Sequence, residues 1–257
     1  MEGIHIMKLK VPFNLVQGTQ PLLLSPMYSK DEKNILEYGV MHDDINLIFN
    51  TVCELLEIPE WLPYELKIAC IYKIREISFG GDLTLRYKCP KCGRLTESIT
   101  MLDNLLEWNS TQQLPKELSE LKLKKNNLEE IFKFNISNAF EYFEGVPTPR
   151  TITDASKYAI ALRSKIPSIK RTVDCKCFFC LSIRKINITN KKFIIDSLSE
   201  QTALTMIKQY NALAMNGFTK HDTDSMLPFE REVHAKLFKD RTESMTPTKE
   251  KYHGKME

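Results

Sequence analysis

This chain of 257 residues lacks the sequence motifs on which common catalytic sites are built. It contains no glycine-rich phosphate loop, no Gly-x-Ser-x-Gly nucleophile elbow and no His-Glu-x-x-His helix. Histidine is scarce, and its five copies share neither metal-ligand nor catalytic-triad spacing: His5, His42, His221, His234 and His253. The sequence therefore predicts a protein that is not an enzyme.

Long hydrophobic runs and a strong charge imbalance are also missing. No apolar stretch approaches the roughly 20 residues needed to span a bilayer. The first residues lack the basic and apolar pattern of a signal peptide, so we expect neither a membrane span nor export. With 36 basic and 33 acidic residues, the formal charge is only +3. The 42% hydrophobic content is that of an ordinary globular chain, long enough for one elaborated domain or two small ones.

Cysteine, by contrast, is present in seven copies, and four of them form two Cys-x-x-Cys pairs. Cys89 and Cys92 make the first pair, and Cys177 and Cys180 make the second. Two intervening residues let the backbone turn so that both sulfurs face one ion, and soft thiolates suit tetrahedral zinc. Short segments of strand-like pattern flank both pairs, at residues 83–87, 95–101, 171–173 and 181–188. The sequence therefore predicts a structural zinc site with four thiolate ligands.

Two other uses of these cysteines are less consistent with the sequence. An odd cysteine count and the missing signal pattern disfavour a disulfide framework. A redox-active pair is disfavoured because neither pair opens a predicted helix that would lower a thiol pKa. Because 84 residues separate Cys92 from Cys177, the pairing of the two halves is an inference. Cys175 is an alternative ligand, and only spacing favours Cys177 and Cys180 over it.

The apolar pattern predicts an α+β fold, with a helical body and β-hairpins that form a zinc-ribbon-like site of four cysteines. One helix begins at Ser29, where Ser29 and Glu32 match a capping box. Cys53 and Cys70 lie on apolar faces of predicted helices and are expected in the core. Further helices are predicted over residues 43–57, 64–78, 114–130, 153–165, 198–216 and 224–240.

We expect four segments along the chain. Residues 1–106 hold an N-terminal arm, helices and the first cysteine hairpin, and residues 107–197 form an insertion-like segment with the second hairpin. Residues 198–243 form C-terminal helices, and the polar residues 244–257 are predicted to be a disordered tail.

Several stretches, taken in order, are similar to a known family. Residues 27–36, 66–80 and 83–93, followed by Tyr210–Gly217 and Met226–Glu232, resemble baseplate hub proteins of T-even-like contractile-tail bacteriophages. The resemblance covers about 7–106 and 198–241, and no single motif carries it alone. It implies a virion or assembly protein of the baseplate, assembled in the host cytoplasm, that binds other hub and tail proteins without catalysis. Residues 107–196 go beyond the family pattern.

Candidate partner contacts are the arm Ile4–Leu24, the hairpin tip Phe178 and Phe179, and the closing helix at Phe229 and Arg231. Phe229 is alternatively a core residue, and Arg231 alternatively pairs with Glu230 on the surface.

Nucleic-acid binding is the alternative function. Residues 163–192 contain nine basic side chains and one acidic residue, Asp174. A basic zinc ribbon with Phe178 and Phe179 at its tip suits phosphate contacts and base stacking. Alternatively, the phenylalanines pack against protein and the lysines keep a β-surface soluble.

Overall fold

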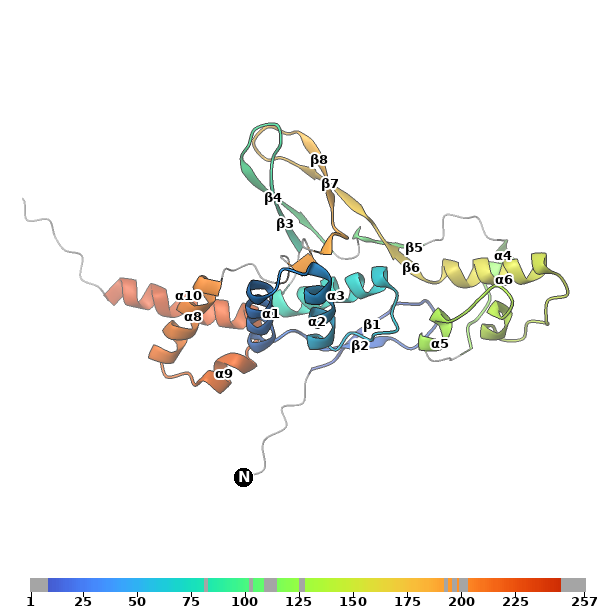
Figure 1. The fold of residues 1–257 in the computed structure, drawn as a ribbon, viewed down its shortest axis with the longest axis horizontal. Coiled ribbons are helices and arrows are strands. Elements are labelled where there is room, and N and C mark those ends of the chain that lie inside the picture. Colours follow the sequence, from blue (N-terminus) through green and yellow to red (C-terminus); the bar gives the residue numbers. More distant parts are fainter. Residues whose placement is uncertain are drawn as a thin grey trace, which may run out of the picture.

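The structure is a computed structural model, and it describes residues 9–80, 83–101, 104–108, 115–124, 128–191, 194–195, 198 and 203–245. Within these ranges the chain is α+β, as predicted, and its strands form small antiparallel pairs. The helices lie in an elongated row, and a ribbon built from strands rises from the middle of that row (Figure 1).

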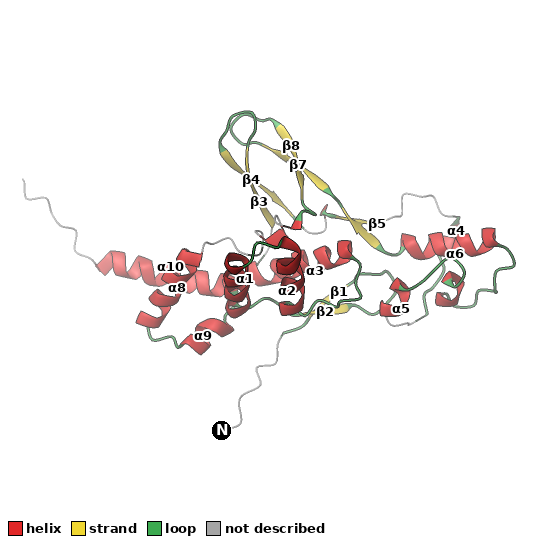
Figure 2. Ribbon diagram, in the orientation of Figure 1, coloured by secondary structure: helices red, strands yellow, loops and turns green. Residues whose placement is uncertain are grey.

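The helices are α1 (Ser29–Met41), α2 (Ile45–Leu55), α3 (Tyr64–Phe79), α4 (Lys116–Ser119), α5 (Leu128–Phe132), α6 (Ile152–Ser164), α8 (Ala203–Met215), α9 (Lys220–Ser225) and α10 (Pro228–Met245), with a 3-10 turn at Ala139–Tyr142. The antiparallel pairs are β1 (Val11–Phe13) with β2 (Leu22–Leu24), β3 (Leu83–Lys88) with β4 (Leu95–Thr100), β5 (Leu106–Trp108) with β6 (Pro167–Ile169), and β7 (Thr172–Lys176) with β8 (Ile183–Asn187). Figure 2 shows that the strands concentrate in the projecting ribbon.

Helix α3 is the centre of the core. Its buried side chains include Cys70, and Cys53 on α2 is buried as well, so both cysteines are core residues as predicted. The Met27 N–H donates to Ser78 Oγ at 2.7 Å, and the Tyr72 hydroxyl donates to the Ile188 carbonyl. One helix therefore holds both the segment that precedes α1 and the segment that follows β8.

The predicted start of α1 is correct, but the predicted cap is wrong. Asp31, and not Glu32, reaches back to the helix start, where its Oδ2 accepts the Tyr28 N–H at 2.9 Å. Glu32 is fully buried. Helix α6 begins at Ile152, one residue before the predicted start, and Thr151 Oγ1 caps it by accepting the Asp154 N–H at 3.1 Å. The local pattern located α1, but Glu32 is buried against Arg231 and Asp31 therefore caps the helix in its place.

The long helix predicted over 114–130 is wrong. Only the four residues of α4 and the start of α5 are helical, and residues 125–127 lie outside the described part. Between them the Lys124 N–H donates to the Tyr142 carbonyl and the Glu144 N–H donates to the Lys122 carbonyl, both at 2.9 Å. Leu123 is buried by this pairing. A tertiary contact thus overrides the helical propensity of a Leu-, Lys- and Glu-rich stretch.

The C-terminal predictions are partly right. The range predicted as one helix, 224–240, covers the end of one helix and most of another. Helix α9 ends at Ser225 and α10 begins at Pro228, a position where the missing N–H of proline loses no helical hydrogen bond. Helix α8 is described from Ala203, and Gly217 follows it with a φ of 89°. Helix α10 continues to Met245, two residues into the predicted tail, and residues 246–257 lie outside the described part, as do Ile4 to Lys8 of the arm.

Strands β5 and β6 mark where a lobe leaves and rejoins the body. Because Trp108 pairs with Pro167, the intervening chain leaves and returns at adjacent points. Helices α4, α5 and α6 lie in this lobe at one end of the molecule, and α8 to α10 lie at the other end (Figure 1).

A buried ion pair joins the N-terminal and C-terminal helices. Arg231 Nη2 on α10 lies 2.7 Å from Glu32 Oε2 on α1, and both side chains are at most 1% exposed. Arg231 Nε also donates to Gln209 Oε1 on α8 at 2.9 Å. The prediction that Arg231 contacts a partner or pairs with Glu230 at the surface is therefore wrong: the guanidinium is sealed inside the helical body.

Replacing Arg231 with Met should strongly destabilise the protein, because the Glu32 carboxylate would keep its buried position without the guanidinium. We expect a loss of about 3 kcal/mol in the free energy of unfolding. Lys116→Met is the matched control, because Lys116 forms an ion pair with Glu120 at the surface, where the two side chains are 86% and 65% exposed. That change should cost less than about 1 kcal/mol. Urea unfolding followed by circular dichroism measures both, and equal losses would contradict the buried pair's importance.

Candidate metal centre

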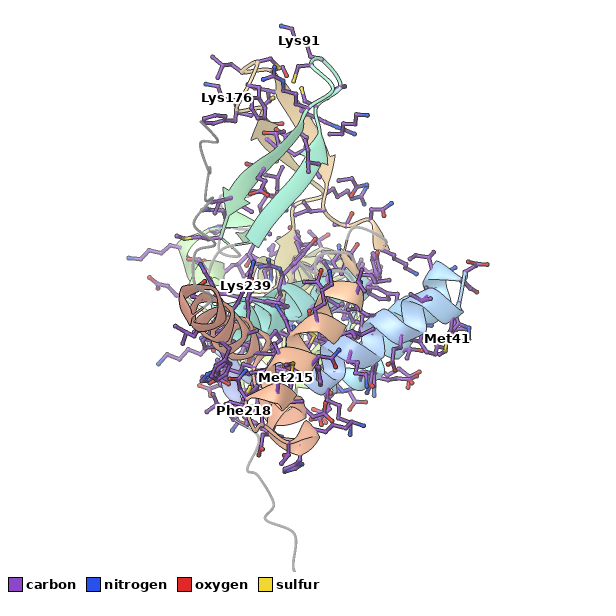
Figure 3. The ribbon with its side chains drawn as sticks, turned by 90° about the vertical axis from the view of Figure 1, so that its left-hand side faces the viewer. Met41, Lys91, Lys176, Met215, Phe218 and Lys239 are labelled. Atoms are coloured by element: carbon purple, nitrogen blue, oxygen red, sulfur yellow. The ribbon has the colours of Figure 1, made fainter. Side chains whose placement is uncertain are left out.

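Two β-hairpins place the paired cysteines at the outer end of the ribbon. In the first hairpin Lys88 pairs with Leu95, and in the second Lys176 pairs with Ile183. Each Cys-x-x-Cys sequence therefore occupies the turn that follows its last strand pair. Figure 3 shows Lys91 and Lys176 far from the helices that carry Met41, Met215 and Lys239.

The two turns have the same backbone hydrogen bonds. In the first, the Cys89 N–H donates to the Arg94 carbonyl at 2.9 Å and the Gly93 N–H donates to the Cys89 carbonyl at 2.8 Å. In the second, the Cys177 N–H donates to the Ser182 carbonyl at 2.8 Å and the Leu181 N–H donates to the Cys177 carbonyl at 2.9 Å. We call these turns knuckle one (Lys88–Leu95) and knuckle two (Lys176–Ile183).

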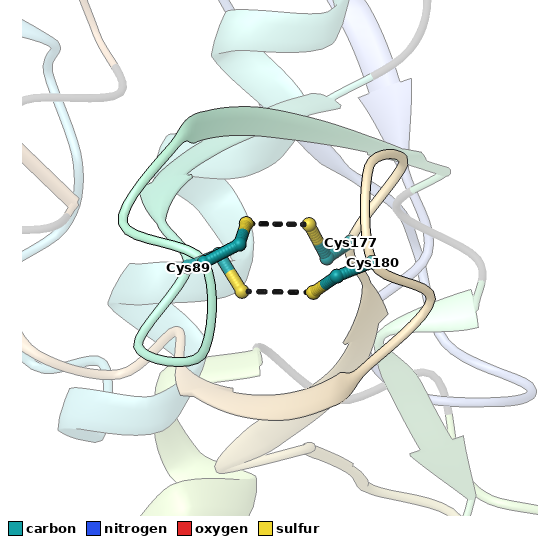
Figure 4. A group of neighbouring side chains, drawn as sticks. Cys89, Cys177 and Cys180 are labelled. Carbon is teal, nitrogen blue, oxygen red and sulfur yellow. Dashed lines mark hydrogen bonds between the residues drawn. The ribbon is translucent and has the colours of Figure 1, made fainter.

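The knuckles bring four sulfurs together. The sulfurs of Cys89, Cys92, Cys177 and Cys180 all lie within 4.8 Å of one another. Across the knuckles, Cys89 Sγ lies 3.6 Å from Cys180 Sγ and Cys92 Sγ lies 3.7 Å from Cys177 Sγ (Figure 4). A disulfide needs about 2.05 Å, so these thiols are free. Four ligands at the usual Zn–S distance of about 2.3 Å lie about 3.8 Å apart in a tetrahedron, so the cluster could hold a metal ion and fits zinc.

Cys175, the alternative ligand, lies outside this cluster. It is fully buried on β7, and burial raises the pKa of its thiol. Strand alternation also turns the Cys175 side chain inward beneath the knuckle, while the exposed Lys176 points outward. The structure therefore assembles the ligand set that spacing favoured.

Ser182 lies against the cluster and links its two halves. Its Oγ is 3.3 Å from Cys89 Sγ and 3.1 Å from Cys180 Sγ. Its hydroxyl and the knuckle N–H groups lower the pKa of Cys89 to about 6, and the same hydroxyl lowers the pKa of Cys180. A lower pKa favours the thiolate, which is the form that binds metal. A hydrogen bond from the Arg94 backbone lowers the pKa of Cys92, but burial and the neighbouring thiols outweigh it and raise that pKa to about 11.

Sequence reasoning missed Ser182. The sequence signal for this position is the internal repeat Lys-Cys-x-x-Cys-x-x-Leu/Ile, in which Ser182 and Arg94 occupy equivalent places after the second cysteine.

The residue after each pair has a left-handed backbone. Gly93 has a φ of 71°, which glycine adopts freely, but Leu181 has a φ of 58° at the equivalent position. A leucine there is strained, because its Cβ approaches backbone atoms. Leu181 is also 64% exposed, so packing does not offset the strain.

The predicted contact residues fall in different surroundings. Phe178 is 81% exposed and Phe179 is 50% exposed, both in knuckle two. Phe229, at the start of α10, is partly exposed, and Arg231 is buried as described above. The structure therefore presents the two tip phenylalanines and Phe229 at the surface.

Comparisons with protein-family models, with curated proteins and with solved structures found no match to this chain. Among the described residues, no helix combines the length and apolar character needed to cross a bilayer.

Cys89→Ser should greatly weaken metal binding, because a serine hydroxyl is a much poorer zinc ligand than a thiolate and only three thiolates remain. The expected result is loss of the one metal ion per chain by elemental analysis, with disordering of both hairpins in amide exchange. Cys175→Ala is the control, because it removes a nearby buried thiol that is not a ligand. It should keep the metal. Loss of metal from Cys175→Ala alone would contradict the ligand assignment.

Leu181→Gly should stabilise the metal-loaded protein by up to about 1 kcal/mol, because glycine relieves the left-handed strain. Gly93→Ala should destabilise it by about 1 kcal/mol for the converse reason. A Cβ at Gly93 would meet no atom within 4 Å, so this cost reports backbone conformation and no steric clash. Chemical denaturation compares the two variants. Shifts of the same sign would disprove the equivalence of the knuckles.

Proposed function

We propose that this protein is a structural or assembly component of the baseplate hub of a contractile-tail bacteriophage. It acts through contacts with other hub and tail proteins, without catalysis, and a structural zinc ion held by four thiolates stabilises it. Its place of action is the virion baseplate, and it is assembled in the host cytoplasm.

The observation that carries this proposal is the packing of the segments that resemble hub proteins. Residues 27–36 include Glu32, and Met226–Glu232 include Arg231, and these two side chains form the buried ion pair. The stretch 66–80 coincides with α3, which is the centre of the core. Segments far apart in sequence thus form one helical body, as expected if they descend together from a hub-type protein.

The metal centre also supports a binding role. Four thiolates fill a tetrahedral shell, so a zinc ion here has no open position for water or substrate. Such an ion joins two hairpins that have little core of their own, and it makes the ribbon rigid. A rigid projection with exposed phenylalanines is suited to docking.

The structure gives less support to nucleic-acid binding, because several of the basic side chains in residues 163–192 have partners within the chain. Lys170 Nζ donates to the Asn104 carbonyl at 2.8 Å, Arg184 Nη1 donates to the Lys88 carbonyl at 2.8 Å, and Lys191 Nζ donates to Asn46 Oδ1 at 2.7 Å.

In a contractile-tail phage whose genome encodes this chain, an early nonsense codon should block tail assembly. Electron microscopy should show filled heads without contractile tails, and purified protein added to the extract should restore infectious particles. Mass spectrometry of purified particles then separates a retained subunit from an assembly factor that leaves. Normal tails in the nonsense mutant would overturn the proposal.

A salt series provides the second test. Gel-shift assays with purified protein should show no DNA affinity that falls steeply as salt rises. Steep salt-dependent binding would instead support the nucleic-acid alternative.

A further inference from the structure

The two knuckles hold their cysteines in the same way but carry different side chains at the remaining turn positions. Both have the same backbone hydrogen bonds and contribute two sulfurs each. Knuckle one achieves this with Pro90, Lys91 and Gly93, which are ordinary turn residues. Knuckle two has Phe178, Phe179 and Leu181 at the same positions. Metal binding therefore does not require these apolar side chains.

Folding does not require them either. Phe178, Phe179 and Leu181 are 81%, 50% and 64% exposed. Leu181 is in addition held in the left-handed conformation that glycine adopts in knuckle one. Strain that neither packing nor metal binding explains indicates a functional constraint. Two further exposed apolar residues flank them at the equivalent strand starts, Leu95 at 67% and Ile183 at 70%.

The charged side chains of the two knuckles are all basic. Residues 88–96 and 176–184 contain five basic side chains and no acidic one: Lys88, Lys91, Arg94, Lys176 and Arg184. In the described part of the chain, no ion pair neutralises Lys91 or Lys176, which lie at the outer end of the ribbon (Figure 3). A complementary partner surface is therefore acidic around an apolar pocket.

The aromatic geometry favours a protein over a nucleic acid. The Phe178 and Phe179 rings meet edge to face, with centroids 5.7 Å apart and planes at 88°. The Arg94 guanidinium lies 4.9 Å from the Phe179 centroid and covers that ring. Base stacking needs open, parallel faces. The remaining apolar side chains are aliphatic, and they fit a protein pocket better than a base.

We propose that knuckle two is a docking tip for an acidic protein surface with an apolar pocket, and that the metal centre holds this tip in shape. The tip comprises Phe178, Phe179 and Leu181, with Leu95 and Ile183 beside them and the five basic residues around them. The identity of the partner as another hub or tail protein rests on the proposed function. Such a tip is a compact anchor of the kind that dominates binding energy in interfaces.

Photo-crosslinking during assembly tests this docking tip. Purified full-length protein carrying p-benzoylphenylalanine at position 178 is added to the nonsense-mutant extract and irradiated, and crosslinked peptides are identified by mass spectrometry. We expect one predominant phage structural protein, linked through a peptide with a surplus of Asp and Glu. The control carries the same group at position 152, where Ile152 is 82% exposed on α6. A nuclease-sensitive product, or no crosslink above this control, would overturn the inference.

A triple variant, Phe178→Ser, Phe179→Ser and Leu181→Gly, tests the energetic role. It should retain one metal ion per chain and the unfolding midpoint of the native protein, or exceed it. Restoration of infectious particles in the extract should fall at least about tenfold. Ile152→Ser should restore particles normally. Full activity of the folded, metal-loaded triple variant would overturn the docking tip and leave the proposed hub function intact, whereas failure of the unmodified protein would count against the hub function itself.

Discussion

The convergence of four thiols from two distant hairpins is the constraint on which the projecting ribbon depends. Each hairpin is only two strands, and an isolated two-stranded hairpin is marginal in water. Their sulfurs meet within 4.8 Å, and Ser182 contacts one cysteine from each side. The buried side chains of these strands include only Leu85, Tyr87, Thr96, Cys175 and Ile186 among the described ones, which is a small core for a ribbon of this reach. A metal ion bound by these four sulfurs would supply the cross-link that so few apolar contacts do not.

The helical body is closed by a different interaction. Glu32 and Arg231 are 199 positions apart in the chain and meet in the core, and Gln209 joins them from α8. A buried pair of this kind adds little net stability compared with apolar residues, but a packing that separated the partners would leave an uncompensated buried charge. It therefore specifies how α1, α8 and α10 pack, and it gives the ribbon a defined base.

The two knuckles have the same backbone hydrogen bonds but different side chains at their turns. Gly93 and Leu181 occupy equivalent positions with φ values of 71° and 58°, although only glycine adopts this conformation freely. The same replacement of turn residues by apolar ones occurs at Phe178 and Phe179. A sequence under pressure only to bind metal would keep proline, lysine and glycine at both sites. Knuckle two instead carries exposed apolar groups, and they are placed where a partner would meet them.

Local sequence determined the helix start at Ser29, the extent of α3, the flanking strands and the two Cys-x-x-Cys turns, because capping, periodicity and turn chemistry act over a few residues. It could not predict that Arg231 is buried, since the sequence fits a surface ion pair with Glu230 as well as a buried ion pair with Glu32, and only the packing of the helices distinguishes them. It also could not predict that the helix is interrupted in the Leu-, Lys- and Glu-rich stretch around Leu123, where β-pairing with Phe143 overrides helical propensity. Spacing favoured Cys177 and Cys180, but only tertiary structure excluded Cys175 and brought the two pairs together. That choice depends on contacts between residues more than 80 positions apart, which no local pattern encodes.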